Sequence, residues 1–329
     1  MLFMVGLELL SPEEKIALLS QLNAVTSLNV FNQGLQKGFK TLGDGVASIT
    51  TWLVGRASPR TGELMRQTKD ALSRDVDVIN RAVDNEAMRL SRLHPRTVSR
   101  QLYRKVRALA QVDASATRDQ IAAALINRAA VNLGMDVHLY PDAISLENAV
   151  FEAIIKEQME ALKARLAGAS AKEIADLEEI LGQELAKLSE ADRKAIREVI
   201  GVDEISARTF INFLHSTSAL IAAQTLIGGF GFGSFLFLTT AIKAFSLLIG
   251  VTFPFSVYMA ATSTLAFLLS APFLAISATF LGGYVLRKTS TRLDDELAKM
   301  IIQVGRVKLL ANKTEAEQKG GPQPGRLSS

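Results

Sequence analysis

The stretch of sequence that decides the fold runs from Thr209 to Leu286 and reads TFINFLHSTSALIAAQTLIGGFGFGSFLFLTTAIKAFSLLIGVTFPFSVYMAATSTLAFLLSAPFLAISATFLGGYVL. It contains one formally charged side chain, Lys243, and no acidic residue. About 20 apolar residues are enough for a helix to cross a bilayer, and helices that face water normally carry charge on one side. The stretch therefore predicts membrane association.

Glycine and proline residues interrupt this stretch, and both residue types tend to end or bend helices. The residues that signal these breaks are Gly229, Gly231, Gly233 and Pro254. We therefore expect helices near 209–227, 232–251 and 255–286. The first is the most polar and is expected at the membrane interface or against protein. The other two are expected to form a transmembrane hairpin, although the length also permits three crossings.

The flanks of the apolar stretch predict its orientation. Arg287, Lys288 and Arg292 follow it directly, and positive residues beside a membrane span are retained on the cytoplasmic side. An even number of crossings returns the N-terminal part to the same side, and the N-terminus lacks the basic segment of a signal peptide. We expect the protein at the cytoplasmic (inner) membrane, with the N-terminal domain and the C-terminus in the cytoplasm.

Lys243 conflicts with a simple transmembrane helix, because an ionisable group at the centre of a span costs about 2.5 to 3.5 kcal/mol. Its side chain either extends to a lipid headgroup, faces a water-filled pathway between helices, or faces protein. The pathway is the candidate functional role. A helical domain that keeps the hairpin in its core until it is triggered, as in a pore-forming protein, is equally compatible with the sequence.

The remainder of the chain predicts helices, and no strand-like alternation persists. Ser11, Ser170 and Ser189 each precede an acidic residue by three positions, a pattern typical of helix starts. Apolar spacing over 151–166 and 174–188 predicts an αα-hairpin. We expect an all-α protein with four regions: an N-terminal helical region 1–144, an acidic helical hairpin and charged helix 145–205, the hydrophobic region 206–286, and 287–329.

The last region begins with a basic amphipathic helix. Apolar residues at spacings of four and three, from Leu293 to Val307, favour packing of this helix on the N-terminal domain rather than self-association. From Lys319 onward, the polar residues, glycines and prolines predict a disordered tail.

A basic stripe lies between Ala87 and Val112, where seven basic residues occur without an acidic one. On a helix that starts at Pro95, the residues Arg96, Arg100, Arg104 and Arg107 share one face. The stripe either docks on the acidic helices of residues 145–204, or contacts anionic lipids, or binds nucleic acid. Nucleic acid is the least favoured partner, because Tyr103 is the only aromatic residue nearby that bases can stack on.

The chain shows no constellation for catalysis. It has no cysteine, and His94, His138 and His215 are far apart and lack a second ligand at helical spacing. No phosphate-binding loop occurs, and no pair of carboxylates stands out for acid and base chemistry. We predict a protein that is not an enzyme and has no cofactor or metal.

Several elements between residues about 145 and 271 resemble, in their order, the YaaW-like family of uncharacterised bacterial proteins. They are the helical pair, the charged helix Leu188 to Ile200, the glycine-rich segment Gly228 to Gly233, Ala241-Ile242-Lys243-Ala244 and Val251-Thr252-Phe253-Pro254. The apolar region here is longer and more hydrophobic than in that family. The resemblance implies no established activity.

The sequence favours two classes of function. The first is a membrane-inserting, pore-forming or membrane-depolarising effector of the toxin or defence type. The alternative is a membrane-anchored adaptor, assembly factor or chaperone without catalytic activity. The expected partners are the lipid bilayer, its anionic lipids, and a protein partner or a second copy of the chain.

Overall fold

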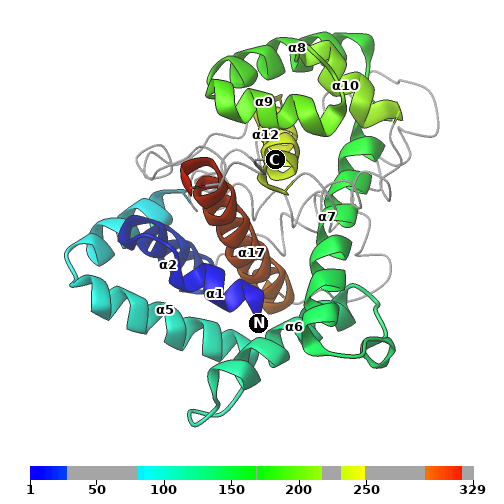
Figure 1. Cartoon of the computed structure of the whole chain (residues 1–329). Coiled ribbons are helices and arrows are strands. Elements are labelled where there is room, and N and C mark those ends of the chain that lie inside the picture. Colours follow the sequence, from blue (N-terminus) through cyan, green and yellow to red (C-terminus); the bar gives the residue numbers. More distant parts are fainter. Residues whose placement is uncertain (28–79, 168, 217–230, 249–292, 321–329) are drawn as a thin grey trace, which may run out of the picture.

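The structure is a computed structural model that describes residues 1–27, 80–167, 169–216, 231–248 and 293–320 (Figure 1). These residues form helices and contain no strand. The prediction of an all-α fold is therefore confirmed for this part of the chain. One continuous hydrophobic core connects the helices near the N-terminus with those that follow.

The N-terminal helices surround one side of the core. They are α1 (Leu2–Glu8), α2 (Pro12–Ser27), a helix of residues 80–91, α5 (Pro95–Ala110) and α6 (Arg118–Asn132). The predicted helix start at Ser11 is confirmed: its backbone N–H donates to Glu14 Oε2 at 2.6 Å, and the Glu14 N–H donates to Ser11 Oγ at 3.2 Å. This reciprocal pair satisfies two amide donors that a helix leaves free at its first turn.

A second group of helices follows. It consists of the short 3-10 helix η2 (Val137–Leu139), α7 (Ala143–Ala167), α8 (Ala171–Ala186), α9 (Glu190–Ile200) and α10 (Ala207–Ser216). The predicted starts at Ser170 and Ser189 are confirmed as the N-caps of α8 and α9. The predicted αα-hairpin needs correction. Helices α7 and α8 are consecutive, but α8 packs on α10 and α12 instead of along α7, because α12 and α10 cover its apolar stripe of Leu177, Leu181 and Leu185.

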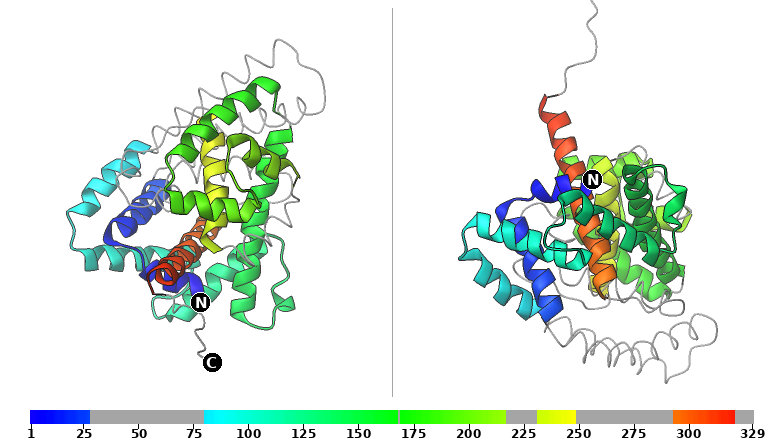
Figure 2. Two further views of the ribbon diagram at one scale, coloured as in Figure 1. Left: turned by 45° about the horizontal axis from the view of Figure 1, so that its top comes forward. Right: turned by 90° about the horizontal axis from the view of Figure 1, so that it is seen from below.

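Helix α17 (Leu293–Gly320) runs through the centre and packs on α1, α5, α6, α7 and α12. Figure 2 shows it between the N-terminal helices and the group that includes α7 and α12. Its packing on the N-terminal helices confirms the prediction from its apolar spacing. The predicted basic amphipathic character is wrong for residues 297–307, which are all buried, because the cations there pair with carboxylates inside the protein.

Helices α1 and α17 approach each other at two glycines, Gly6 and Gly305. A Cβ atom added to Gly6 would lie 1.7 Å from the Gly305 carbonyl oxygen, and one added to Gly305 would lie 2.2 Å from the Phe3 carbonyl oxygen. Only residues without a side chain allow this backbone contact. The pair fixes where the N-terminal helix crosses the central one.

Helix α12 (Gly231–Leu248) corresponds to the first helix of the predicted transmembrane hairpin, and it packs on α8, α9, α17 and α7. No helix among the residues that the structure describes is both long and apolar enough to cross a membrane. The hairpin is therefore not supported, because α12 places its apolar surface against other helices of the domain. Gly231 and Gly233 lie in the first turn of α12.

The other predictions for this region fall outside the described residues. They concern Gly229, Pro254, the predicted helix 255–286, the flanking residues Arg287, Lys288 and Arg292, and the tail from residue 321.

Candidate functional site

The candidate site is the enclosed segment of α12. Its described side chains from Leu236 to Ala244 are buried apart from Lys243, which is partly exposed. Phe237 stacks on Phe210 of α10 with ring centroids 4.0 Å apart and meets the edge of Phe213 at 5.1 Å. A helix that is apolar on all sides is stable only when something covers all of it. In this structure the covering is protein.

Lys243 has a specific partner inside the domain. Its Nζ atom lies 2.5 Å from Oε2 of Glu184, which belongs to α8. The Glu184 side chain is 5% exposed and that of Lys243 is 20% exposed, so the ion pair is largely buried. Of the three environments considered for Lys243, the structure therefore has the one in which the lysine faces protein. A role in a water-filled pathway remains a prediction.

Glu184 also accepts a hydrogen bond from Lys187 Nζ at 2.6 Å, so one carboxylate holds two ammonium groups. Burial alone raises the pKa of Glu184, but the hydrogen bonds and charges of Lys187 and Lys243 outweigh it, and the pKa is lowered. The carboxylate is therefore ionised at neutral pH and balances the single charge of α12.

The second concentration of buried polar groups lies along α17. Lys299 Nζ contacts Glu157 Oε2 of α7 at 3.1 Å and Glu296 Oε1 at 2.8 Å. One turn later, Gln303 and Gln158 exchange two hydrogen bonds of 3.0 and 3.1 Å. Burial raises the pKa of Glu296 despite Lys299, since the charge of Glu157 adds to the effect. Burial lowers the pKa of Lys299, but the two carboxylates outweigh it and raise the pKa overall.

The same row of polar groups anchors the N-terminal helix. Glu147 is completely buried and accepts hydrogen bonds from the backbone N–H groups of Leu2 at 2.7 Å and Phe3 at 2.6 Å. Arg306 of α17 donates to Glu147 at 3.4 Å and to Asn148 at 2.8 Å. A carboxylate at a helix N-terminus is stabilised by the free amides and by the helix dipole. Glu147 therefore joins α1, α7 and α17 at one point.

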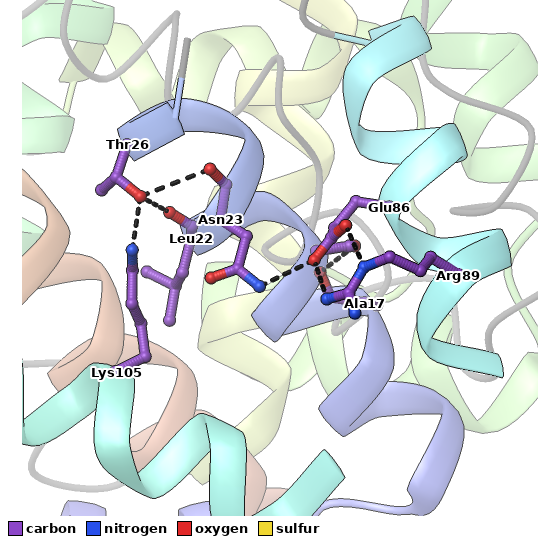
Figure 3. A network of polar contacts seen from close by, with 8 residues as sticks. Ala17, Leu22, Asn23, Thr26, Glu86, Arg89 and Lys105 are labelled. Carbon is purple, nitrogen blue, oxygen red and sulfur yellow. Dashed lines mark hydrogen bonds and ion pairs between the residues drawn. The ribbon is translucent and has the colours of Figure 1, made fainter. Parts of the chain in front are cut away.

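The basic stripe extends from the end of the helix of residues 80–91, which holds Arg89, through the turn at Arg92 and along α5. Three of its seven cations have partners in the chain. Arg89 donates two hydrogen bonds to Glu86, at 2.6 and 2.7 Å, and Lys105 donates one to the hydroxyl of Thr26 (Figure 3). Arg107 donates to the Ala114 carbonyl at 2.8 Å. Glu86 also accepts a hydrogen bond of 2.8 Å from Asn23 of α2 (Figure 3).

The other four cations of the stripe, Arg92, Arg96, Arg100 and Arg104, are exposed. Docking of the stripe on the acidic helices is not what the structure shows. Helix α5 packs on α2, α6 and α17, and the acidic helices α8 and α9 lie at the other end of the molecule (Figure 1).

The three histidines lie apart from one another, at the start of α5, in η2 and in α10. His94 caps α5, accepting a hydrogen bond of 3.2 Å from the Arg96 backbone N–H at its Nδ1 atom, and His138 and His215 are exposed. No group of three or more potential metal ligands occurs among the described residues.

The sequence did not identify the partners of the buried polar groups: Glu184, Glu147 and Glu157, which pair with cations of α12 and α17, and Gln158, which pairs with the amide of Gln303. They look like ordinary polar residues of amphipathic helices. A partial signal exists for Glu184, because it lies next to Leu185 and one turn after Leu181, at the edge of the apolar stripe of α8.

Comparisons with known proteins give no match to this chain, whether with family models, curated proteins or solved structures. The resemblance to the YaaW-like family therefore stays a prediction.

Proposed function

We propose that the chain is a non-enzymatic helical protein that stores an apolar helix, α12, in its core and inserts its apolar region into the cytoplasmic membrane when that helix is released. Insertion then permeabilises or depolarises the membrane. The observation that carries the proposal is the enclosure of α12, a helix with a single charge whose counter-ion is supplied by another helix.

The composition of α12 supports this proposal over a purely structural core helix. The residues that follow α12 also lack charge as far as Leu286. On both sides of Lys243, the sequence is therefore apolar enough to be suited to lipid. Two of the helices that enclose α12, α8 and α9, carry exposed charged residues, as expected of a water-soluble cover. The enclosed segment therefore has two environments that satisfy it, the domain core and a bilayer.

The ion pair between Lys243 and Glu184 is the element that sets the balance between these environments. Inside the domain, the carboxylate compensates the ammonium group. In a bilayer, the ammonium group alone costs about 2.5 to 3.5 kcal/mol. The pair therefore opposes release, and its loss favours departure of α12 from the domain.

The test is dye release from vesicles by the full chain, comparing the native protein with Glu184→Gln. This substitution removes the negative charge at nearly constant shape. Glu190→Gln is the matched control, because Glu190 pairs with Arg197 at 2.7 Å but is 72% exposed. We expect Glu184→Gln to accelerate dye release from phosphatidylglycerol-containing vesicles and Glu190→Gln to leave the rate unchanged.

Two results would overturn the proposal. Vesicle binding without dye release by the native protein or either variant would favour the membrane-anchored adaptor. Equal acceleration by Glu184→Gln and Glu190→Gln would show that general loss of charge, rather than the enclosure of α12, controls the effect. Circular dichroism of each variant establishes beforehand that it is folded.

A further inference from the structure

Four arginines form a basic ladder, defined as Arg92, Arg96, Arg100 and Arg104: Arg92 lies in the turn before α5, and the other three lie on the outer face of α5. All four side chains are exposed, and none makes a hydrogen bond or ion pair within the described part of the chain. Residues four apart on a helix are neighbours on its surface, so Arg96, Arg100 and Arg104 form one row. The row is followed by Arg107, whose side chain is bound to a backbone carbonyl.

The ladder is held rigidly by the buried face of the same helix. Val98, Leu102, Val106 and Leu109 are each at most 4% exposed. His94 caps the helix start. The buried face therefore fixes the backbone positions of Arg96, Arg100 and Arg104 on the side of α5 that faces away from the core.

Unpaired cations in one row need an anionic partner, because no carboxylate lies on α5 or in residues 87–112. Among the described residues, the acidic helices α8 and α9 do not serve as this partner, since they lie at the other end of the molecule (Figure 1). This separation makes one end of the molecule basic and the other acidic. The partner is therefore external to the described domain.

The side chains beside the ladder indicate which anion it binds. Tyr103, which is 37% exposed, lies one turn from Arg100 and from Arg107 on the same face. Tyrosine is enriched at membrane–water interfaces, because its ring can contact the apolar phase while its hydroxyl stays hydrated. Bases of single-stranded nucleic acid need several stacking aromatics, and the exposed face of α5 has only this one.

We propose that the basic ladder is a docking surface for anionic phospholipid headgroups and places the folded domain on an anionic membrane before α12 is released. This inference rests on the proposed function for its biological purpose, but the binding step is separate from insertion. Each arginine near a charged leaflet contributes about fivefold in affinity, so removal of three of them is expected to weaken binding roughly 100-fold.

The test measures sedimentation of the full chain with vesicles of phosphatidylcholine alone or with added phosphatidylglycerol. The ladder variant carries Arg96→Gln, Arg100→Gln and Arg104→Gln together. The matched control carries Lys172→Gln, Lys194→Gln and Arg208→Gln, which removes three exposed cations from α8, α9 and α10. We expect the native protein and the control to bind the anionic vesicles, with affinity that falls as salt is added, and the ladder variant to lose that binding.

Equal loss in both variants would overturn the inference, because net charge alone would then explain binding. Equal binding of the native chain to both types of vesicle would also overturn it. Tighter binding to a single-stranded oligonucleotide than to anionic vesicles, lost in the ladder variant, would assign the surface to nucleic acid instead. Dye release separates this inference from the proposed function. If the native chain binds anionic vesicles without releasing dye, only the proposed insertion is refuted. If dye release is the same for the native chain and the ladder variant, and the same from anionic and neutral vesicles, only the role of the ladder is refuted.

Discussion

The ion pair of Lys243 and Glu184 permits a quantitative prediction through a double-mutant cycle. Glu184→Gln leaves an ammonium group that is 20% exposed without its carboxylate. Removal of one partner from a fully buried pair costs about 3 to 5 kcal/mol. Because Lys243 retains some contact with water, we expect Glu184→Gln to lower the free energy of unfolding by about 2 to 3 kcal/mol.

Substitution of the lysine is expected to lower the free energy of unfolding by less than substitution of the glutamate. Lys243→Met removes the charge of α12 while Glu184 keeps Lys187, whose side chain is 64% exposed. The methionine side chain suits the apolar surroundings, so we expect a loss of about 1 kcal/mol or less. The double variant carries neither charge and is expected to resemble Lys243→Met. The interaction energy from the cycle is then about 2 kcal/mol.

Urea unfolding followed by far-ultraviolet circular dichroism at neutral pH measures the four free energies. Glu190→Gln provides the control, and we expect no change there because its carboxylate is solvated. Additive effects of Glu184→Gln and Lys243→Met would refute the reasoning. Such a result would mean that the two side chains do not stabilise each other and that α12 is not held by this pair.

Four further predictions follow from the packing and the charges. Gly305→Ala is expected to destabilise the fold by about 3 kcal/mol, since its Cβ would meet the Phe3 carbonyl. Gly182→Ala should instead stabilise α8 by about 0.5 to 1 kcal/mol, because no atom lies within 4 Å of the added carbon. Urea unfolding of the two variants measures the difference. Gln21→Met is expected to stabilise by about 1 kcal/mol, because the amide of Gln21 is buried and makes no hydrogen bond in the part that the structure describes; a loss in thermal midpoint would contradict this. Glu296→Gln is expected to keep or increase stability at neutral pH, since burial raises the pKa of Glu296 and Glu157 still holds Lys299; a loss comparable to that of Glu184→Gln would be inconsistent with a carboxylate that burial disfavours. The pKa of Glu184 is lowered in the folded protein, so its ionised carboxylate stabilises the fold above the ordinary value of 4.5, and this contribution is lost as pH falls below that value. The free energy of unfolding should therefore decrease more steeply with falling pH for the native protein than for Glu184→Gln.

Local rules predicted the parts of the fold that depend on neighbouring residues. The starts of α2, α8 and α9 were predictable from serine and an acidic residue three positions later, because this pair completes its hydrogen bonds within one turn. The helix predicted near 232–251 corresponds to α12, Gly231–Leu248, whose first turn contains two glycines of the run that marked the break. The common face of Arg96, Arg100, Arg104 and Arg107 on α5 was predictable from their spacing.

The same rules misassigned α17 and the helical hairpin. The segment of α17 was predicted to be a basic amphipathic helix, whereas its polar residues Lys299, Gln303 and Arg306 are all buried. Polar residues at helical spacing predict exposure only if nothing covers them, and here α7 supplies a carboxylate, an amide or both for each. The partners are far away in the sequence, and periodicity alone carries no information about them.

The sequence by itself determined that the protein is helical, where its charges are concentrated, and that one apolar helix carries a single lysine. These properties follow from residue types and from spacings of three and four, which act within one helix. Only the tertiary structure decided that Lys243 meets Glu184, that Glu147 caps α1, that α17 is central and that Arg96, Arg100 and Arg104 find no partner among the described residues. Such contacts depend on how whole helices cross, and the crossing is fixed by close packing, as at Gly6 and Gly305, rather than by any local pattern.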